Sequence, residues 1–337
     1  MGGEVFLFTF AKTQTIATPA MSIIILDGYP GNPGDLSWDR LRQLAPCTIY
    51  DRTPSSQVVE RAQGHDILLT NKVPITAEQI EALPQLRFIG VLATGFNIID
   101  VEAAHRHGIT VCNVPAYSTA SVAQLTIAHL LNICCQVQHY TLEARQGLWS
   151  RQPFFSYTNT PVIELADKTI GIVGLGQIGS AVARMALGLG MRVQAFTSKD
   201  AATLPEGIRK AKSLDELLAT SHVVTLHCPL TPTTRHLIDA RALSLMRHDA
   251  ILLNTSRGPL VDEQALTEAL SSRQIMAAGL DVLETEPPRD DNPLLALDNC
   301  YITPHMAWAS FEARKRLMAI TADNIEAFLA GKPINTV

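Results

Sequence analysis

The chain has 337 residues, of which 47% are hydrophobic and 18% are charged, so it is long enough to form two domains with buried cores. Its 27 basic and 32 acidic residues give a formal net charge of −5, and no long basic run is present to follow a nucleic-acid backbone. The six cysteines form no C-x-x-C pair, and no segment has about 18 uninterrupted apolar residues. We therefore expect a soluble, reduced, cytoplasmic protein with no nucleic-acid, membrane or metal partner.

Residues 1–20 are interpreted as an N-terminal extension, because a β-type run begins just after a second methionine, Met21. A signal peptide is the less favoured interpretation, since the apolar patch in this stretch lacks a basic leader.

The following part of the chain alternates between β-type and helical runs. Strands are expected at 23–26, 67–70, 88–91 and 110–112, with helices at 77–83 and 101–107. This alternation is typical of an α/β domain. A helical segment near 310–329 would return to it, so the predicted substrate domain comprises residues 22–117 and 310–337.

A single long helix is predicted from about residue 118 to 147, buried on more than one side because its apolar residues do not form one stripe. A second series of strands is expected at 169–173, 192–196, 223–226, 251–254, 278–280 and 301–303. This series predicts a dinucleotide-binding Rossmann domain over residues 118–309. The predicted fold class is therefore α/β, with two Rossmann-like domains, parallel sheets and a cleft between them.

A G-x-G-x-x-G turn, formed by Gly174, Gly176 and Gly179, stands between a β-type run and an alanine-rich helical stretch. The first glycine allows a tight turn, the second lets the backbone approach a pyrophosphate, and the third lets the helix pack closely on its strand. Gln177 and Ile178 lie where that helix begins, so their amide groups would face the anion. An ordinary glycine-rich turn is the alternative, but the flanking segments favour a dinucleotide site.

Three chemically active side chains follow the later strands, where ligands of an open parallel sheet bind. Arg257 offers a planar fork suited to a carboxylate or a ketone oxygen. Glu286 and His305 could pair, and a carboxylate beside an imidazole favours the imidazolium, which donates a proton to a ketone. Taken singly, Arg257 is typical of a surface charge and His305 of a structural histidine.

The glycine turn, the Asn-Thr-Ser-Arg-Gly segment at 254–258, Glu-Pro at 286–287 and Thr-Pro-His at 303–305 occur in this order. Together they resemble the D-isomer-specific 2-hydroxyacid dehydrogenase family over about residues 21–337. The set is far more specific than any one of its members.

The resemblance implies a role for each of these residues. Arg257 would hold the substrate's carboxylate and carbonyl, His305 would transfer the proton, and Glu286 would support His305 while a nicotinamide transfers hydride. The amides of Thr94 and Gly95, in a loop at 92–97, would receive the substrate carboxylate; a plain turn is the alternative.

Segments at 26–29, 32–38, 93–97 and 305–309 most resemble family members that act on hydroxypyruvate. The resemblance thus implies reversible, NAD(P)H-dependent reduction of hydroxypyruvate and glyoxylate to D-glycerate and glycolate. Trp308 would close over a small substrate or, equally well, serve as a core indole. Two alternatives stay open: another D-2-hydroxyacid specificity, and a dinucleotide-sensing protein of the corepressor kind that acts by binding partners.

The acid expected about 20 residues past the glycine turn is absent. Thr197, Ser198 and Lys199 stand there instead, and their hydroxyls and ammonium could accept a 2′-phosphate, which favours NADP over NAD. The alternative is that Lys199 is a solvated charge and NAD binds. By resemblance, other residues would line the cofactor cleft: His227, Cys228, Pro229, Thr255, Ser256, Arg257, Asp281 and His305.

The long helix and the aromatic loop after it, with Trp149, Phe154 and Phe155, resemble the family's dimerisation segment. Burying them would remove a sizeable apolar patch from water. We therefore expect a homodimer.

Overall fold

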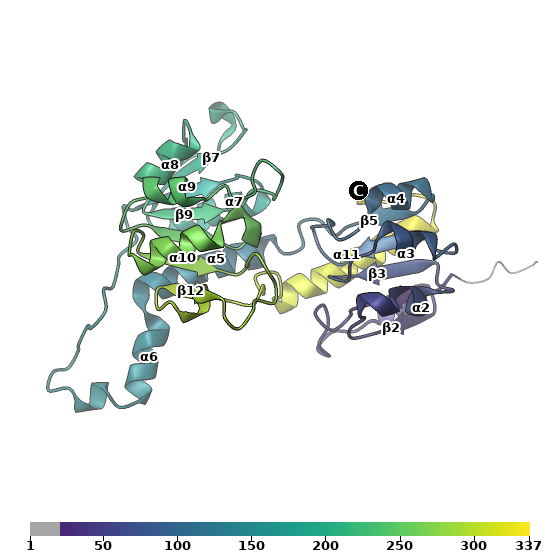
Figure 1. The fold of residues 1–337 in the computed structure, drawn as a ribbon, viewed down its shortest axis with the longest axis horizontal. Helices are drawn as coiled ribbons and strands as arrows, with labels where there is room; N and C mark the ends of the chain where they lie inside the picture. Colours follow the sequence, from purple (N-terminus) through teal and green to yellow (C-terminus); the bar gives the residue numbers. More distant parts are fainter. Residues whose placement is uncertain (1–20) are drawn as a thin grey trace, which may run out of the picture. The chain divides into compact units, whose positions relative to one another are not determined.

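The computed structural model describes residues 21–337, so the predicted extension at 1–20 lies outside the described residues. Two compact units are present (Figure 1). Among the described residues, one consists of 21–115 together with Leu317–Val337, and the other is Ala116–Arg316. The chain returns to the first unit inside its last helix, rather than at residue 310.

The first unit contains a five-stranded sheet of order β2-β1-β3-β4-β5, in which every neighbouring pair is parallel. Its central strands are fully buried apolar runs, as expected for a parallel sheet covered on both faces. The strands are β1 (Ile23–Ile25), β2 (Cys47–Ile49), β3 (Ile67–Thr70), β4 (Phe88–Val91) and β5 (Thr110–Cys112). The helices are α1 (Asp39–Leu44), η1 (Ser55–Gln57), α2 (Val58–Ala62), α3 (Ala77–Glu81), α4 (Val101–Arg106) and α11 (Phe311–Leu329).

The second unit contains a seven-stranded parallel sheet of order β12-β11-β10-β9-β6-β7-β8. Its strands are β6 (Thr169–Val173), β7 (Arg192–Phe196), β8 (Ile208–Lys210), β9 (Val223–Leu226), β10 (Ile251–Asn254), β11 (Ala277–Leu280) and β12 (Cys300–Ile302). The longer helices are α5 (Thr119–Cys135), α6 (Val137–Arg145), α7 (Gln177–Gly188), α8 (Leu214–Thr220), α9 (Ala240–Leu245) and α10 (Glu263–Ser271). Single-turn helices are η2 (Trp149–Arg151), η3 (Ala201–Thr203), η4 (Gly258–Leu260) and η5 (Pro293–Ala296).

The two faces of the seven-stranded sheet carry separate cores. Ile251 and Leu253 of β10 pack with α5 and α7, whereas Leu252 between them packs with α8, α9 and α10. Successive side chains of a strand point to opposite faces, which produces this division.

The strand order places a ligand crevice at a definite edge of each sheet. In the second unit β6 lies between β7 and β9. The chain adds β7 and β8 on one side of β6 and then β9 to β12 on the other, so the strand order reverses beside β6. In the first unit the same reversal occurs beside β1. Ligands of such sheets bind outside the carboxyl ends of the strands at this point.

The predicted single helix over 118–147 is wrong. The helix ends at Cys135, because Gln136 adopts a left-handed conformation with φ of 53°, and α6 begins after it at an angle of 58° to α5. The side-chain amide of Gln136 stabilises the break by donating to the carbonyl of Ile133 at 2.9 Å and to the hydroxyl of Tyr301 at 3.1 Å. Helix α5 is buried over a wide face as expected, but α6 has no buried residue.

In residues 21–337, no single helix meets the length and hydropathy expected of a membrane span; α5 and α6 meet them only as a bent pair.

Two strands, β2 and β8, were not predicted from the sequence. Both are three-residue edge strands with exposed positions, so neither contains a continuous apolar run.

Candidate active site

The glycine turn lies at the reversal of the seven-stranded sheet, between the ends of β6 and β9. Gly174 has a φ of 93°, and a Cβ there would stand 2.7 Å from the carbonyl oxygen of His227. A Cβ at Gly179 would stand 2.2 Å from the carbonyl oxygen of Gly174, whereas a Cβ at Gly176 would meet nothing within 4 Å. Gly174 and Gly179 therefore lie against protein backbone, whereas Gly176 faces open space. Gly176 is the glycine predicted to let the backbone approach a pyrophosphate.

Helix α7 begins at Gln177, next to Ile178, and runs for 12 residues, so its amino end follows the turn directly. Across the turn, Nδ1 of His227 is buried and has no hydrogen-bond partner in the part of the chain that the structure describes, while Nε2 lies 2.9 Å from Oγ1 of Thr225. Burial lowers the pKa of His227 to about 3, so the ring is neutral near pH 7. The open glycine and this buried ring nitrogen both fit a dinucleotide.

The residues after His227 lie beside the same turn. The backbone nitrogen of Cys228 would be 2.8 Å from a Cβ at Gly174, and burial raises the pKa of the Cys228 thiol. The carbonyl of Pro229 accepts a hydrogen bond from the Thr234 hydroxyl at 2.7 Å, which closes the loop that follows.

The residues predicted to meet a 2′-phosphate follow β7. Ser198 and Lys199 are exposed, and the backbone nitrogen of Lys199 donates to Oγ1 of Thr197 at 3.3 Å. A second cation, Lys210, reaches this turn from β8, where its Nζ donates to the Lys199 carbonyl at 2.6 Å. Sequence reasoning missed Lys210, because only the pairing of β8 with β7, with Lys210 opposite Ala195, brings it there.

Arg257 is held by the polar residues that follow β10. The amide of Asn254 donates to the Arg257 carbonyl at 2.9 Å and accepts from the backbone nitrogen of Ser256 at 3.0 Å. The hydroxyl of Ser256 donates to the carbonyl of Leu226, and that of Thr255 lies 2.8 Å from the hydroxyl of Thr126. The half-buried guanidinium of Arg257 donates to the Ser256 carbonyl at 2.7 Å.

His305 and Glu286 form a hydrogen-bonded pair. Nδ1 of His305 lies 2.6 Å from Oε2 of Glu286, so the predicted contact is present. The other oxygen of Glu286 accepts from the backbone nitrogen of Leu283 at 3.1 Å, which fixes the carboxylate at both oxygens. Because Nδ1 is used in this way, Nε2 is the ring nitrogen placed to exchange a proton with a ligand.

The His305 loop is anchored by a buried carboxylate. Oδ1 of Asp281 accepts from Oγ1 of Thr303 at 2.6 Å and from the backbone of Met306 at 2.9 Å, and Oδ2 accepts from that of Ala307 at 2.8 Å. Nε2 of His129 lies 3.0 Å from the Thr303 hydroxyl. Burial raises the pKa of Asp281. The predicted contact of Asp281 with a nicotinamide amide stays a prediction. Sequence reasoning missed that Asp281 anchors this loop and that His129 contacts Thr303.

Trp308 lies in the same loop and meets Tyr117 edge to face, with ring centroids 6.5 Å apart. This contact fits both a lid and a packed indole, so the two interpretations of Trp308 stay open.

Thr94 and Gly95 belong to the first unit. The Thr94 hydroxyl donates to the carbonyl of Val114 at 3.0 Å, and the carbonyl of Thr94 accepts from the amide of Asn113 at 2.7 Å. These bonds hold the loop on its own sheet, and the predicted substrate contact stays a prediction.

A buried carboxylate at the sheet reversal, missed from the sequence, supports this loop. Asp27 accepts from the backbone of Asn71 at 2.7 Å, and the amide of Asn71 donates to the carbonyl of Leu92 at 2.6 Å. The sequence feature that could have indicated Asp27 is a carboxylate placed soon after a buried strand.

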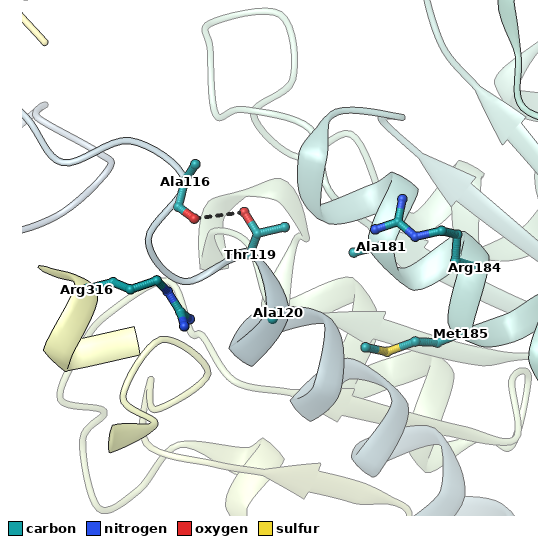
Figure 2. A pocket seen from close by; sticks show the side chains of 7 residues that line it. All are labelled: Ala116, Thr119, Ala120, Ala181, Arg184, Met185 and Arg316. Atoms are coloured by element: carbon teal, nitrogen blue, oxygen red, sulfur yellow. Dashed lines mark hydrogen bonds between the residues drawn. The ribbon is translucent and has the colours of Figure 1, made fainter. Parts of the chain in front are cut away.

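A cavity of about 400 Å³ lies between the amino end of α5 and α7 (Figure 2). It is lined by Ala116, Thr119, Ala120, Ala181, Arg184, Met185 and Arg316. None of the predicted site residues lines it. Within residues 21–337 no group of three or more histidine, cysteine or acidic side chains is placed to hold a metal ion.

The sheet reversal, the glycine turn and the histidine–glutamate pair are those of a dinucleotide-dependent oxidoreductase. Residues 127–307 match the D-isomer specific 2-hydroxyacid dehydrogenase NAD-binding domain. The chain is 47% identical over 321 residues to a hydroxypyruvate reductase of Blautia hydrogenotrophica. The aligned region covers 94% of this chain and 99% of that protein. It belongs to the D-isomer specific 2-hydroxyacid dehydrogenase family.

Two other relatives extend this similarity. The chain is 41% identical over 283 residues to a glycerate dehydrogenase of Methylorubrum extorquens, covering 83% of this chain and 88% of that protein. The structure also resembles an NADPH-dependent glyoxylate/hydroxypyruvate reductase of Sinorhizobium meliloti, solved in complex with NADP and malonate. Here the TM-score is 0.82 at 27% identity, over 94% of this chain and 97% of that one.

Proposed function

We propose that the protein reduces hydroxypyruvate, and also glyoxylate, to D-glycerate and glycolate with a reduced nicotinamide cofactor. The observation that carries this proposal is the pairing of His305 with Glu286 at the carboxyl ends of neighbouring strands, with Arg257 following the next strand along. The names of the relatives at 47% and 41% identity support the choice of substrate.

The residues divide the reaction between them. A bound reduced nicotinamide supplies hydride to the carbonyl carbon. Nε2 of His305 gives a proton to the carbonyl oxygen, and Glu286 stabilises the imidazolium before the transfer and orients its ring. The Arg257 guanidinium holds the carboxylate and polarises the carbonyl. In the reverse direction the neutral His305 accepts the proton of the alcohol.

We propose NADP as the preferred cofactor. The turn at 197–199 contains no carboxylate, Lys199 stands in it, and Nζ of Lys210 reaches it from β8, where it donates to the Lys199 carbonyl. A phosphate with two negative charges is favoured beside two cations and two hydroxyls. The Sinorhizobium meliloti relative, crystallised with NADP, supports this preference.

We propose that two chains associate through α6 and the segment after it, called here the arm (residues 137–163). In Figure 1 the arm projects from its own unit. It exposes large apolar side chains, with Phe154 72% and Phe155 92% exposed, while its polar groups bond to one another, as in the 2.8 Å contact of Tyr157 with Glu143. An ordered apolar arm of this kind favours a protein partner, and a second copy is the simplest one.

Initial rates with hydroxypyruvate, glyoxylate, pyruvate and phenylpyruvate, each with NADH and NADPH, test the proposal. We expect the highest kcat/KM for hydroxypyruvate with NADPH. Fast reduction of pyruvate or phenylpyruvate alone would point to another specificity within the family. Tight cofactor binding with no turnover of any acid would favour a dinucleotide-sensing protein instead.

A further inference from the structure

A second histidine–glutamate pair lies next to the first. Nε2 of His236 is hydrogen-bonded to Oε1 of Glu284, and Nη2 of Arg235 lies 3.7 Å from the same oxygen. Both side chains of the pair are about one-third exposed, at 36% and 29%. None of the roles assigned so far uses either residue.

The backbone of His236 lies along the segment that follows Arg257. Its nitrogen donates to the carbonyl of Pro259 at 2.8 Å, and the nitrogen of Ile238 donates to the carbonyl of Leu260 at 3.0 Å. His236 itself has a φ of 51°, a left-handed conformation that few residues adopt. The loop is therefore fastened to the Arg257 segment through backbone bonds that do not depend on the imidazole.

The backbone of Leu283 and Glu284 touches the same segment at Gly258. A Cβ at Gly258 would stand 1.9 Å from the carbonyl oxygen of Leu283, so only glycine permits this approach. The nitrogen of Glu284 donates to a carboxylate oxygen of Glu263, and the nitrogen of Leu283 donates to Glu286. A displacement of Glu284 would thus be transmitted within two residues to the carboxylate that holds His305.

We propose that His236 is a positioning residue whose imidazole, through Glu284, holds the segment 283–286 and thereby the Glu286 carboxylate against His305. The catalytic part of this inference rests on the proposed function. Because a polar side-chain contact this exposed contributes little to overall stability, the effect of the His236–Glu284 contact is expected to be local. A small misplacement of an orienting group is enough to slow catalysis severalfold or more.

The kinetic test compares His236→Ala, His236→Gln and Arg273→Ala with the wild-type enzyme. We expect His236→Ala to lower kcat by about tenfold while the KM values for the keto acid and cofactor change by less than about twofold. Glutamine places an amide nitrogen near the position of Nε2, so His236→Gln should recover most of the lost kcat. Arg273→Ala breaks an exposed ion pair with Asp298 in the same unit and should leave both parameters unchanged.

A double variant separates positioning from a general structural role. If His236 acts through Glu286, His236→Ala should have almost no further effect on kcat in a Glu286→Gln enzyme. Full additivity of the two effects, or a loss in His236→Ala that His236→Gln does not recover, would overturn the inference.

Backbone hydrogen–deuterium exchange tests the same contact without turnover. We expect faster exchange over residues 280–288 in His236→Ala and no change over this segment in Arg273→Ala. Unchanged exchange in His236→Ala would contradict the inference whether or not the enzyme is active. A wild-type protein that reduces no 2-keto acid would defeat the proposed function, and the exchange result would still decide the structural claim.

Discussion

The backbone nitrogen of His305 donates a hydrogen bond to the carbonyl oxygen of Asp281 over 2.8 Å. This bond joins the proposed proton donor to the residue that follows β11, and the Asp281 carboxylate then accepts two amides from the two residues after His305. His305 adopts a left-handed φ of 50°, so its loop needs such fixed partners. The orientation of the imidazole is therefore set from a buried carboxylate as well as from Glu286.

Replacing that carboxylate should damage both the fold and the reaction. Asp281→Ala leaves buried amide donors unpaired, which should lower the free energy of unfolding by about 1–3 kcal/mol and reduce kcat by at least about tenfold. Urea unfolding and steady-state rates would measure the two effects. Asp298→Ala is the control, because its side chain is 80% exposed. Wild-type kcat in folded Asp281→Ala would contradict the anchoring role.

Lys210 should discriminate between the two cofactors. Lys210→Ala removes one of the two cations at the turn after β7, so we expect the KM for NADPH to rise by about 5- to 10-fold while that for NADH stays the same. Lys332→Ala, an exposed lysine of the other unit, is the matched control. An equal rise for both cofactors, or none, would argue against a 2′-phosphate site here.

Phe155, at 92% exposure, is the most exposed large apolar side chain of the arm. Placing a charge there, in Phe155→Asp, should weaken association without affecting the core of the unit. Sedimentation velocity should show two chains for the wild type and a shift towards one chain for the variant. A wild-type protein that sediments as one chain at micromolar concentration would rule out the dimer.

His227 should make the protein sensitive to acid. Burial lowers the pKa of His227 to about 3. The stability that the neutral ring contributes is therefore fully present above the unfolded-state pKa near 6.5 and is lost as the pH falls towards 3. Lowering the pH from 7 to 5 should reduce the free energy of unfolding by about 2 kcal/mol through this one group. His227→Gln should remove that part of the pH dependence, whereas exposed His248→Gln should not. Equal slopes for wild type and His227→Gln would contradict the burial of a neutral ring.

The parallel strands of both sheets could be predicted well where they are buried on both faces. β3, β4, β6, β9 and β10 have the predicted bounds, because apolar runs of this length flanked by turns permit little else, and β5 and β7 have theirs as well. The edge strands β2 and β8 lack such runs. The break at Gln136 depends on a contact with Tyr301, which is distant in sequence, so local periodicity cannot indicate it.

The candidate site shows the same division. Arg257, Glu286 and His305 follow predicted strands, and a parallel sheet brings strand ends to one edge, so the contact of His305 with Glu286 could be inferred. Lys210 and His236 could not be found in this way. Each depends on pairing between segments that only the folded chain brings together, β8 with β7 in one case and the 236 loop with Glu284 in the other.

The central claim is that His305 transfers the proton in the reduction of a 2-keto acid. Its most direct test is the kcat for hydroxypyruvate with saturating NADPH in wild type and in His305→Gln, with cofactor affinity measured by fluorescence in both. We predict that kcat falls by about 10²- to 10⁴-fold while cofactor affinity is retained. A folded His305→Gln enzyme with near wild-type kcat would contradict the account.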